Sequence, residues 1–263
     1  MNDKPGKPKL AYRDPDFMES KAARPLRILS EYAQPFSRFE YAHVRDTIVV
    51  FGSARTPSPE QLEAMSAEQR TPQVERMARY YEDARAISHR LTEWSKGLDR
   101  DDRRFVICTG GGPGIMEAAN RGASEARGTN IGLGIELPFE ASGNPYITRQ
   151  LQFEFHYFFT RKFWFAYLAK AIVVMPGGFG TMDELFEVLT RAQTGKLKKP
   201  IALVLYGTEF WEKVINLDAL VEFGVISPED VNLFHRSDDV DDTVRYVTEQ
   251  LTRNHLSDPG PML

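Results

Sequence analysis

Three segments of the chain repeat one order of features: a short apolar run, a glycine-rich turn, and further on a stretch with helical periodicity. The apolar runs begin at Thr47, Phe105 and Ala171, and the helices that follow are predicted at residues 73–96, 113–126 and 181–193. Two more apolar runs occupy residues 130–137 and 200–207. Uninterrupted apolar strands that alternate with helices are typical of a parallel sheet buried on both faces. The sequence therefore predicts an α/β fold with a doubly wound, mostly parallel sheet.

The predicted domain spans residues 46–253 as a single unit, and its last helix is expected at residues 241–253. Residues 1–45 are rich in Pro, Lys, Arg and Asp, which predicts a partly disordered N-terminal extension leading into one short helix, with little chemistry of its own. Residues 254–263 are predicted to form a loose tail.

The charge balance disfavours several classes of partner. There are 33 Lys plus Arg against 37 Asp plus Glu, a net charge of −4, so the chain lacks the positive field of a general nucleic-acid or membrane-surface binder. No stretch reaches the roughly 18 apolar residues of a membrane helix, so a soluble protein is expected. The single Cys108, without any Cys/His cluster, predicts a reducing, cytoplasmic compartment and no metal site.

The first glycine-rich turn, residues 110–114, follows the strand that ends at Cys108. Glycines let the backbone approach a ligand, and exposed N–H groups at a helix start favour an anion such as phosphate. Pro113 is expected in the first turn of the helix, where its missing N–H costs nothing. A tight strand-to-helix turn without a ligand explains the same residues. The dinucleotide and Walker A fingerprints are both absent from the glycine-rich turns.

The second glycine-rich turn, Met175 to Glu184, is the sharper signal. Thr181 and Glu184 have the spacing of a capping box, in which the two side chains satisfy the first N–H groups of a helix. The alternative is an anion site, in which several N–H groups and Thr181 surround one ligand while Glu184 faces the same crevice. Both hypotheses remain open at this level.

Between the two turns, nine of the fifteen residues from Phe153 to Tyr167 are aromatic. So dense an aromatic stretch predicts core or a subunit interface. Arg161 and Lys162 lie within it, where they could bind an anion or extend to solvent. Glu117, in the first turn after residue 114, either complements the helix dipole or points into the crevice.

Together these motifs resemble the Lonely Guy (LOG) family of nucleotide 5′-monophosphate phosphoribohydrolases. The resemblance is carried by GSAR at 52–55, TGGGPGIMEAANRGA at 109–123, LPFE and NPY within 137–146, FFTRK at 158–162 and PGGFGTMDE at 176–184. It implies a Rossmann-like homodimer or higher homo-oligomer that needs no metal or cofactor. It also implies hydrolysis of the N-glycosidic bond of a nucleoside 5′-monophosphate, AMP-like or a cytokinin riboside monophosphate, to free base and ribose 5-phosphate.

The resemblance also assigns roles to residues. It places the catalytic groups at Arg161 and Glu184. Substrate and phosphate binding is expected from Gly52, Ser53, Gly110, Gly111, Gly112, Gly114, Glu117, Lys162, Gly177, Gly178, Gly180 and Thr181. Where plant-type members have His-Glu before the Arg-Lys pair, this chain has Phe159 and Thr160, which leaves ordinary purine or pyrimidine monophosphates open as substrates.

Three other functions were weighed against this one. Lysine decarboxylation needs a Schiff-base lysine for pyridoxal phosphate, and the motifs offer no lysine with an identifiable partner for the pyridine nitrogen. A non-enzymatic nucleotide or molybdenum-cofactor carrier shares the glycine-rich loops, but the pairing of Arg161 with Glu184 favours the hydrolase. An inactive oligomerisation module would keep the same loops only as structure.

Overall fold

The computed structural model describes residues 8–98, 101–137, 143–197, 200–257 and 259–261. Its strands form one sheet in the order β4-β3-β2-β1-β5-β6-β7, and every neighbouring pair is parallel. The strands are β1 (Thr47–Phe51), β2 (Val106–Thr109), β3 (Asn130–Ile135), β4 (Gln152–Phe155), β5 (Ala169–Val174), β6 (Ala202–Tyr206) and β7 (His235–Ser237). The predicted doubly wound α/β fold is confirmed, although β4 and β7 had no counterpart among the predicted strands.

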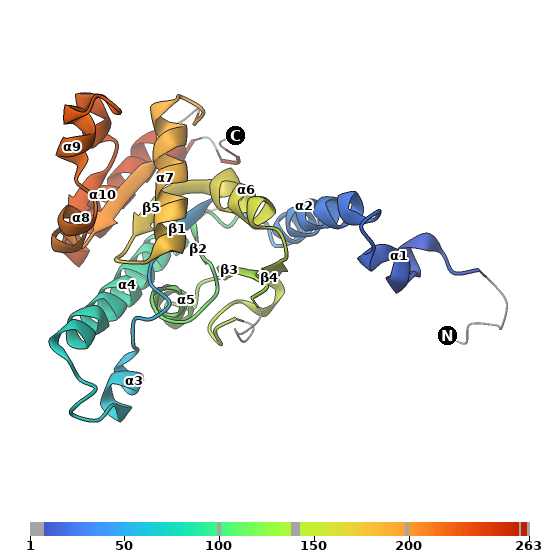
Figure 1. Cartoon of the computed structure of the whole chain (residues 1–263), viewed down its shortest axis with the longest axis horizontal. Helices are drawn as coiled ribbons and strands as arrows, with labels where there is room; N and C mark the ends of the chain where they lie inside the picture. Colours follow the sequence, from blue (N-terminus) through green and yellow to red (C-terminus); the bar gives the residue numbers. More distant parts are fainter. Residues whose placement is uncertain (1–7, 99–100, 138–142, 198–199, 258, 262–263) are drawn as a thin grey trace.

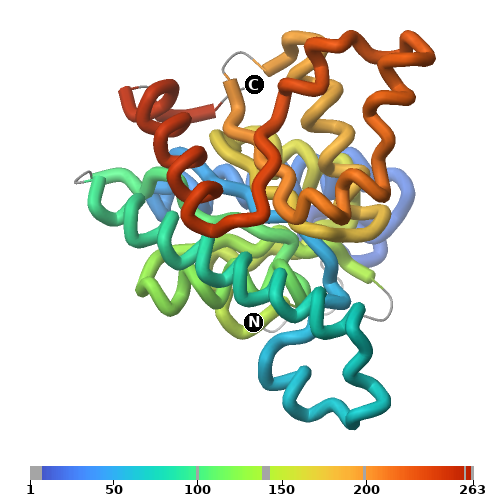
Figure 2. The backbone as a smooth tube through the Cα atoms, turned by 90° about the vertical axis from the view of Figure 1, so that its left-hand side faces the viewer, coloured from blue at the N-terminus to red at the C-terminus, as the bar shows by residue number. Residues whose placement is uncertain are grey.

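Helices cover both faces of the sheet. One face packs against α4 (Pro72–Lys96), α5 (Ile115–Glu125) and α10 (Val240–His255), and Figure 2 shows α4 and α10 side by side. The other face packs against α2 (Arg24–Tyr41), α6 (Phe158–Leu168), α7 (Phe179–Gln193) and α8 (Thr208–Val214). Alternate β1 residues divide between the two cores, Ile48 and Val50 on one side and Val49 and Phe51 on the other. Every β1 side chain is thus buried, which explains the uninterrupted apolar run.

Shorter elements complete the chain. They are η1 (Ala11–Arg13), α1 (Pro15–Glu19), α3 (Pro59–Ala64), η2 (Arg149–Leu151), α9 (Leu217–Glu222) and η3 (Pro228–Asn232). Among the described residues, no helix combines the length and apolarity needed to cross a bilayer.

The strand order reverses between β1 and β5. From β1 the chain continues outward to β2, β3 and β4, whereas from β5 it continues outward to β6 and β7 on the other side. In a sheet of this kind a crevice opens at the carboxyl ends of the two central strands. The turns after β1, β2 and β5 therefore meet at one edge of the sheet, as the sequence predicted.

The N-terminal segment differs from its prediction. Instead of one short helix, it contains α2, 18 residues long, which lies against α6 (Figure 1). The Phe39 ring of α2 is 5.2 Å from that of Phe153 and 5.3 Å from that of Trp164. The prediction was wrong because abundant charges hid an apolar face that only the sheet and α6 reveal. Residues 1–7 of the extension and 138–142 of the LPFE motif lie outside the described residues.

The C-terminal segment is not loose where the structure describes it. Helix α10 extends to His255, and the backbone N–H of Gly260 donates to Asp46 Oδ1 at 3.1 Å. Arg104 donates to the carbonyl of His255 at 2.6 Å and to that of Leu256 at 3.2 Å. The tail prediction failed because these partners are far apart in sequence. Residues 258, 262 and 263 lie outside the described residues.

Candidate active site

A cavity of about 960 Å³ opens at the carboxyl edge of the sheet. From the turns after β1 and β2 it is lined by the predicted residues Gly52, Ser53, Gly110, Gly111 and Gly112. From α6 and the start of α7 it is lined by the predicted residues Arg161, Gly178, Gly180, Thr181 and Glu184. Four predicted site residues are not among the described residues that line the cavity: Gly114, Gly177, Glu117 and Lys162. The tertiary structure therefore brings most of the predicted site into one cavity.

The turn after β2 depends on two glycines with positive φ, Gly111 at +75° and Gly114 at +69°. A Cβ on Gly114 would lie 2.3 Å from the Ser53 carbonyl oxygen, which accepts a hydrogen bond from Ile115 N at 3.0 Å. Gly114 thus joins the turns after β1 and β2 without lining the cavity. Helix α5 begins at Ile115, so the prediction that Pro113 lies in its first turn is wrong. The positive φ of Gly114 delays the helix by two residues.

Buried amides hold this turn, and none of them was among the predicted site residues. Asn144 Nδ2 donates to the carbonyls of Gly111 and Gly112, each at 3.1 Å, and to Asn120 Oδ1 at 2.9 Å. Thr109 Oγ1 also donates to Asn120 Oδ1, at 2.7 Å. Fully bonded buried networks of this kind make a loop rigid. Asn144 belongs to the NPY motif and Asn120 to the first glycine-rich motif. Both motifs were recognised in the sequence, and the two asparagines could have been selected from them.

The start of α7 tests the capping-box hypothesis for the second turn. The N-cap residue is Gly178, which has no side chain to cap the helix, and Thr181 already lies in the first turn. The capping-box hypothesis is therefore wrong, because the helix begins three residues earlier than the TxxE spacing assumes. A Cβ on Gly177 would lie 2.1 Å from Thr181 Oγ1, whereas Gly178 and Gly180 face open space. The first turn of α7 thus presents backbone to the cavity with little side chain in the way.

Glu184 lies one turn further along α7 and is buried, with 7% of its side chain exposed. Its Oε1 atom is 3.8 Å from Arg161 Nη2 of α6. The Arg161 guanidinium lies over the rings of Phe158, at 5.2 Å, and Phe165, at 5.6 Å. Burial raises the pKa of Glu184 to about 7, although the charges of Arg161 and Lys162 oppose the shift. A carboxyl that titrates near neutrality beside a cation is typical of catalytic sites.

Lys162 points to the outside of the same helix pair. Its Nζ lies 2.7 Å from Asp183 Oδ1 and 3.1 Å from Glu187 Oε2, so it joins α6 to α7. Although it does not line the cavity, its charge still favours the ionised form of Glu184. That Lys162 contacts the substrate stays a prediction. In the structure, Lys162 links α6 to α7.

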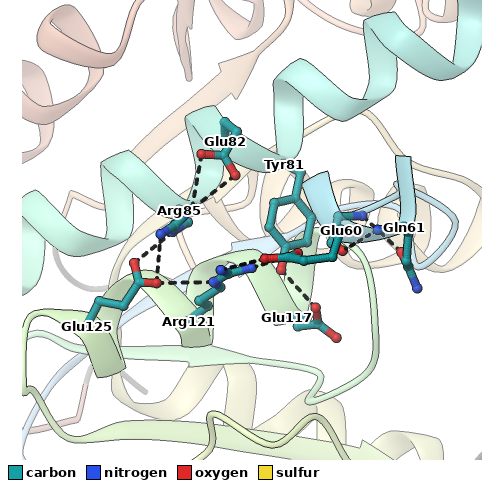
Figure 3. Close-up of polar contacts among 9 residues, drawn as sticks. Glu60, Gln61, Tyr81, Glu82, Arg85, Glu117, Arg121 and Glu125 are labelled. Carbon is teal, nitrogen blue, oxygen red and sulfur yellow. Dashed lines mark hydrogen bonds and ion pairs between the residues drawn. The ribbon is translucent and has the colours of Figure 1, made fainter. Parts of the chain in front are cut away.

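Glu117 also points away from the described lining. It accepts a hydrogen bond from Tyr81 Oη at 2.8 Å, and nearby Arg121 reaches both Glu60, at 2.8 Å, and Glu125, at 3.1 Å (Figure 3). These contacts connect α3, α4 and α5. Of its two predicted orientations, the crevice-facing one is not seen in this structure.

The cavity is also lined by two arginines that were not predicted as site residues. They are Arg55 of the GSAR motif and Arg149 of η2. Both side chains are exposed, and they add positive charge at its rim. No lysine occurs among the described lining residues. No group of three metal-ligating side chains occurs in the part of the chain that the structure describes.

Comparison with known proteins identifies the family of this chain. A family model described as "Possible lysine decarboxylase" matches residues 116–247, which is half of the chain and includes all but the first residue of α5 and the whole of α6 and α7. Relatives of the chain include two Oryza sativa subsp. japonica proteins that bear the LOG name. The chain belongs to the LOG family.

Similarity to individual LOG proteins is partial. Cytokinin riboside 5′-monophosphate phosphoribohydrolase LOG7 of Arabidopsis thaliana is 40% identical over 68 residues, 26% of this chain and 31% of that protein. The corresponding LOG protein of Oryza sativa subsp. japonica is 31% identical over 131 residues, 49% of this chain and 50% of that protein. The chain thus spans half or less of the length of these two relatives.

Among solved structures, the molybdenum cofactor carrier protein of Chlamydomonas reinhardtii aligns with 79% of this chain and 99% of its own, at 18% identity and a TM-score of 0.44.

Proposed function

We propose that this protein hydrolyses the N-glycosidic bond of a nucleoside 5′-monophosphate and releases the free base and ribose 5-phosphate. The observation that carries the proposal is the buried pair of Arg161 and Glu184, in the wall of a cavity that also contains the first turn of α7. The names of the LOG relatives, cytokinin riboside 5′-monophosphate phosphoribohydrolases, agree with this reaction class.

The first turn of α7 suits the 5′-phosphate. Its backbone N–H groups have no partner within the helix, and the helix dipole adds positive potential at the same place. Gly178 and Gly180 leave room for a phosphate to approach the backbone. Holding the phosphate there would fix the ribose relative to Glu184, and such positioning can supply several kcal/mol of the barrier.

Glu184 would act at the sugar. As the C–N bond breaks, positive charge develops on the ribose, and a nearby carboxylate stabilises it or orients the attacking water. The water oxygen bonds to C1′, the base leaves with the electron pair of the C–N bond, and the base takes up a proton. Because the pKa of Glu184 is about 7, this residue can exchange a proton near neutral pH. Arg161 would hold the substrate or favour the departing base.

The decarboxylase named in the family description fits this cavity poorly. Pyridoxal phosphate needs a lysine for its Schiff base, and the described lining contains arginines but no lysine. Buried Lys170, which pairs with Asp46, is at the start of β5 and therefore at the opposite edge of the sheet. The described residues that line the cavity therefore do not fit pyridoxal phosphate.

The proposal is tested by incubating the purified protein with AMP, GMP, CMP, UMP and an isoprenoid-modified AMP while free base is followed by chromatography. We expect base release from at least one nucleotide and a loss of more than about 100-fold in Glu184→Gln, which keeps the size of the side chain. Release by the variant at the wild-type rate would remove Glu184 from the mechanism. Failure of the wild type on every nucleotide, with a bound pterin retained through gel filtration, would favour a carrier.

A further inference from the structure

Helix α6 carries Arg161 but does not cap its own N-terminus. Its N-cap residue, Tyr157, makes no side-chain cap, and its first turn contains no acidic residue. The dipole and the unpaired N–H groups at a helix start are stabilised by a carboxylate, which must then come from elsewhere in the chain.

That carboxylate is Glu31 of α2. Its Oε1 accepts a hydrogen bond from the backbone N–H of His156 at 2.8 Å, and its Oε2 accepts one from that of Tyr157 at 3.3 Å. The hydroxyl of Thr160 lies against the same Oε2 and also reaches the Tyr157 carbonyl oxygen. A side chain more than 120 residues away therefore binds the N-cap residue of α6 and the residue before it, whereas a local cap residue accepts N–H groups inside the first turn.

Further contacts hold α2 in place beside the cavity wall. Trp164 Nε1 donates to the backbone carbonyl of Glu31 at 3.0 Å, which secures the next turn of α6. Arg38 donates to the carbonyl of Gln152 at 2.9 Å and lies over the Phe153 ring at 4.9 Å. Because Gln152 and Phe153 also line the cavity, α2 supports this wall from β4 to α6.

We propose that Glu31 is a positioning residue, which orients Arg161 toward Glu184 by fixing the first turn of α6; this inference rests on the proposed function. The connection is short. Glu31 holds the N–H of Tyr157, and the carbonyl of Tyr157 accepts the backbone N–H of Arg161 at 3.3 Å. Glu31 lies outside the segment matched by the family model, so this part of the chain adds a support of its own.

The two oxygens of Glu31 face only donors, so the charge matters as well as the shape. Glutamine at this position would turn an NH2 group toward one of those donors, and alanine would remove both acceptors. Glu40 supplies a matched control, because it is on the same helix but pairs outward with Arg45 at 2.8 Å. Glu40→Gln therefore removes a carboxylate from α2 whose described ion pair is with Arg45 and not with a residue of α6.

The experiment compares Glu31→Gln, Glu31→Ala and Glu40→Gln with the wild type in the base-release assay. We expect kcat to fall at least about tenfold in both Glu31 variants, because small displacements of catalytic groups are costly. KM should change less than about threefold, because the described contacts of Glu31 do not reach α7, where the phosphate is placed. Backbone amides at residues 156–161 should exchange with deuterium faster in substrate-free Glu31 variants, and Glu40→Gln should match the wild type in every measurement.

A wild-type kcat in both Glu31 variants would overturn the proposal. So would a loss of folded protein with unchanged kcat per folded molecule, because Glu31 would then serve stability alone. If the wild type releases no base at all, the proposed function fails. The exchange measurement still decides whether Glu31 orders α6, because it needs no substrate.

Discussion

At the residue scale, the protonation state of Glu184 governs what the cavity can do. Burial raises its pKa from 4.5 to about 7, and the neighbouring Arg161 and Lys162 limit that rise. A carboxyl whose pKa is raised on folding binds its proton more tightly in the folded state, so its ionised form is reached only near neutrality. Its closeness to Arg161 keeps that ionised form accessible within the physiological pH range.

The pH dependence of turnover follows from this pKa. If the carboxylate is the active form, kcat/KM rises with pH, reaches half of its maximum near pH 7 and then levels off. In Lys162→Met a favourable cation is lost while Asp183 and Glu187 remain, so the midpoint should move up by about 0.5 pH unit or more.

Initial rates between pH 5 and 9 check both expectations. Lys213→Met is the control, because Lys213 pairs with Glu209 at 2.6 Å and is not among the described lining residues. A profile that falls across this range would show that protonated Glu184 is the active form. A midpoint that moves to lower pH in Lys162→Met would contradict the electrostatic argument.

At the element scale, the start of α7 shows how adjacent glycines differ. Gly177 has no room for a methyl group, because Thr181 Oγ1 would lie 2.1 Å from it, and Gly178 faces open space with φ of −92°. Gly177 is therefore needed for packing. At Gly178 the fold leaves room for a side chain. Only a bound ligand would require a glycine at this position.

Alanine at each position separates these roles. Gly177→Ala should lower the free energy of unfolding by about 1–3 kcal/mol, because the new methyl group overpacks the turn. Gly178→Ala should leave stability unchanged or slightly higher, since alanine restricts the unfolded chain. Its KM for the nucleotide should nevertheless rise, because the methyl group occupies space beside the proposed phosphate site.

Urea titrations and steady-state kinetics on the two variants supply the measurements. Equal KM values for Gly178→Ala and the wild type would argue against phosphate binding at this turn. Full stability of Gly177→Ala would mean that Thr181 moves aside without cost.

At the scale of the whole molecule, the C-terminal segment contacts a buried cluster of charged side chains. This cluster lies at the amino edge of the sheet, opposite the cavity. Asp46, Arg104 and Lys170 are each at most 3% exposed. Asp46 pairs with Arg104 and lies 3.7 Å from Lys170, and it also accepts the backbone N–H of Gly260. The starts of three strands and the C-terminal segment thus converge on one carboxylate.

Asp46→Asn leaves two buried cations with less compensation, so we expect it to lower the free energy of unfolding by about 3–5 kcal/mol. Asp241→Asn is the matched control, because that carboxylate pairs with Arg90 at an exposed site. Base release per folded molecule should stay at the wild-type level in both variants, because the cluster is remote from the cavity. A stability equal to that of the control would mean that the cluster contributes little to the fold.

The expected homo-oligomer also belongs to this scale and stays a prediction. Sedimentation velocity at two protein concentrations tests it, and a monomer at both would remove it.

The sequence by itself determined that strands form at the apolar runs that begin at Thr47, Phe105 and Ala171 and at residues 130–137 and 200–207, although their exact bounds differ in the structure. It also determined their parallel sheet and the meeting of the glycine turns at one edge. The strands, the sheet and the meeting of the turns follow from local pattern: an uninterrupted apolar run must be buried on both faces, and a parallel sheet brings its carboxyl ends together. The catalytic roles of Arg161 and Glu184 came from the resemblance to the LOG family and stay predictions.

Only the tertiary structure decided where α7 begins, that Glu117 turns toward Tyr81, and that Glu31 binds the residues that lead into α6. It alone placed the C-terminal segment against Asp46. Each of these features depends on partners from different elements, and Gly260 lies more than 200 residues from Asp46. Side-chain periodicity records which face of an element is buried, but it carries no information on which distant residue will meet it.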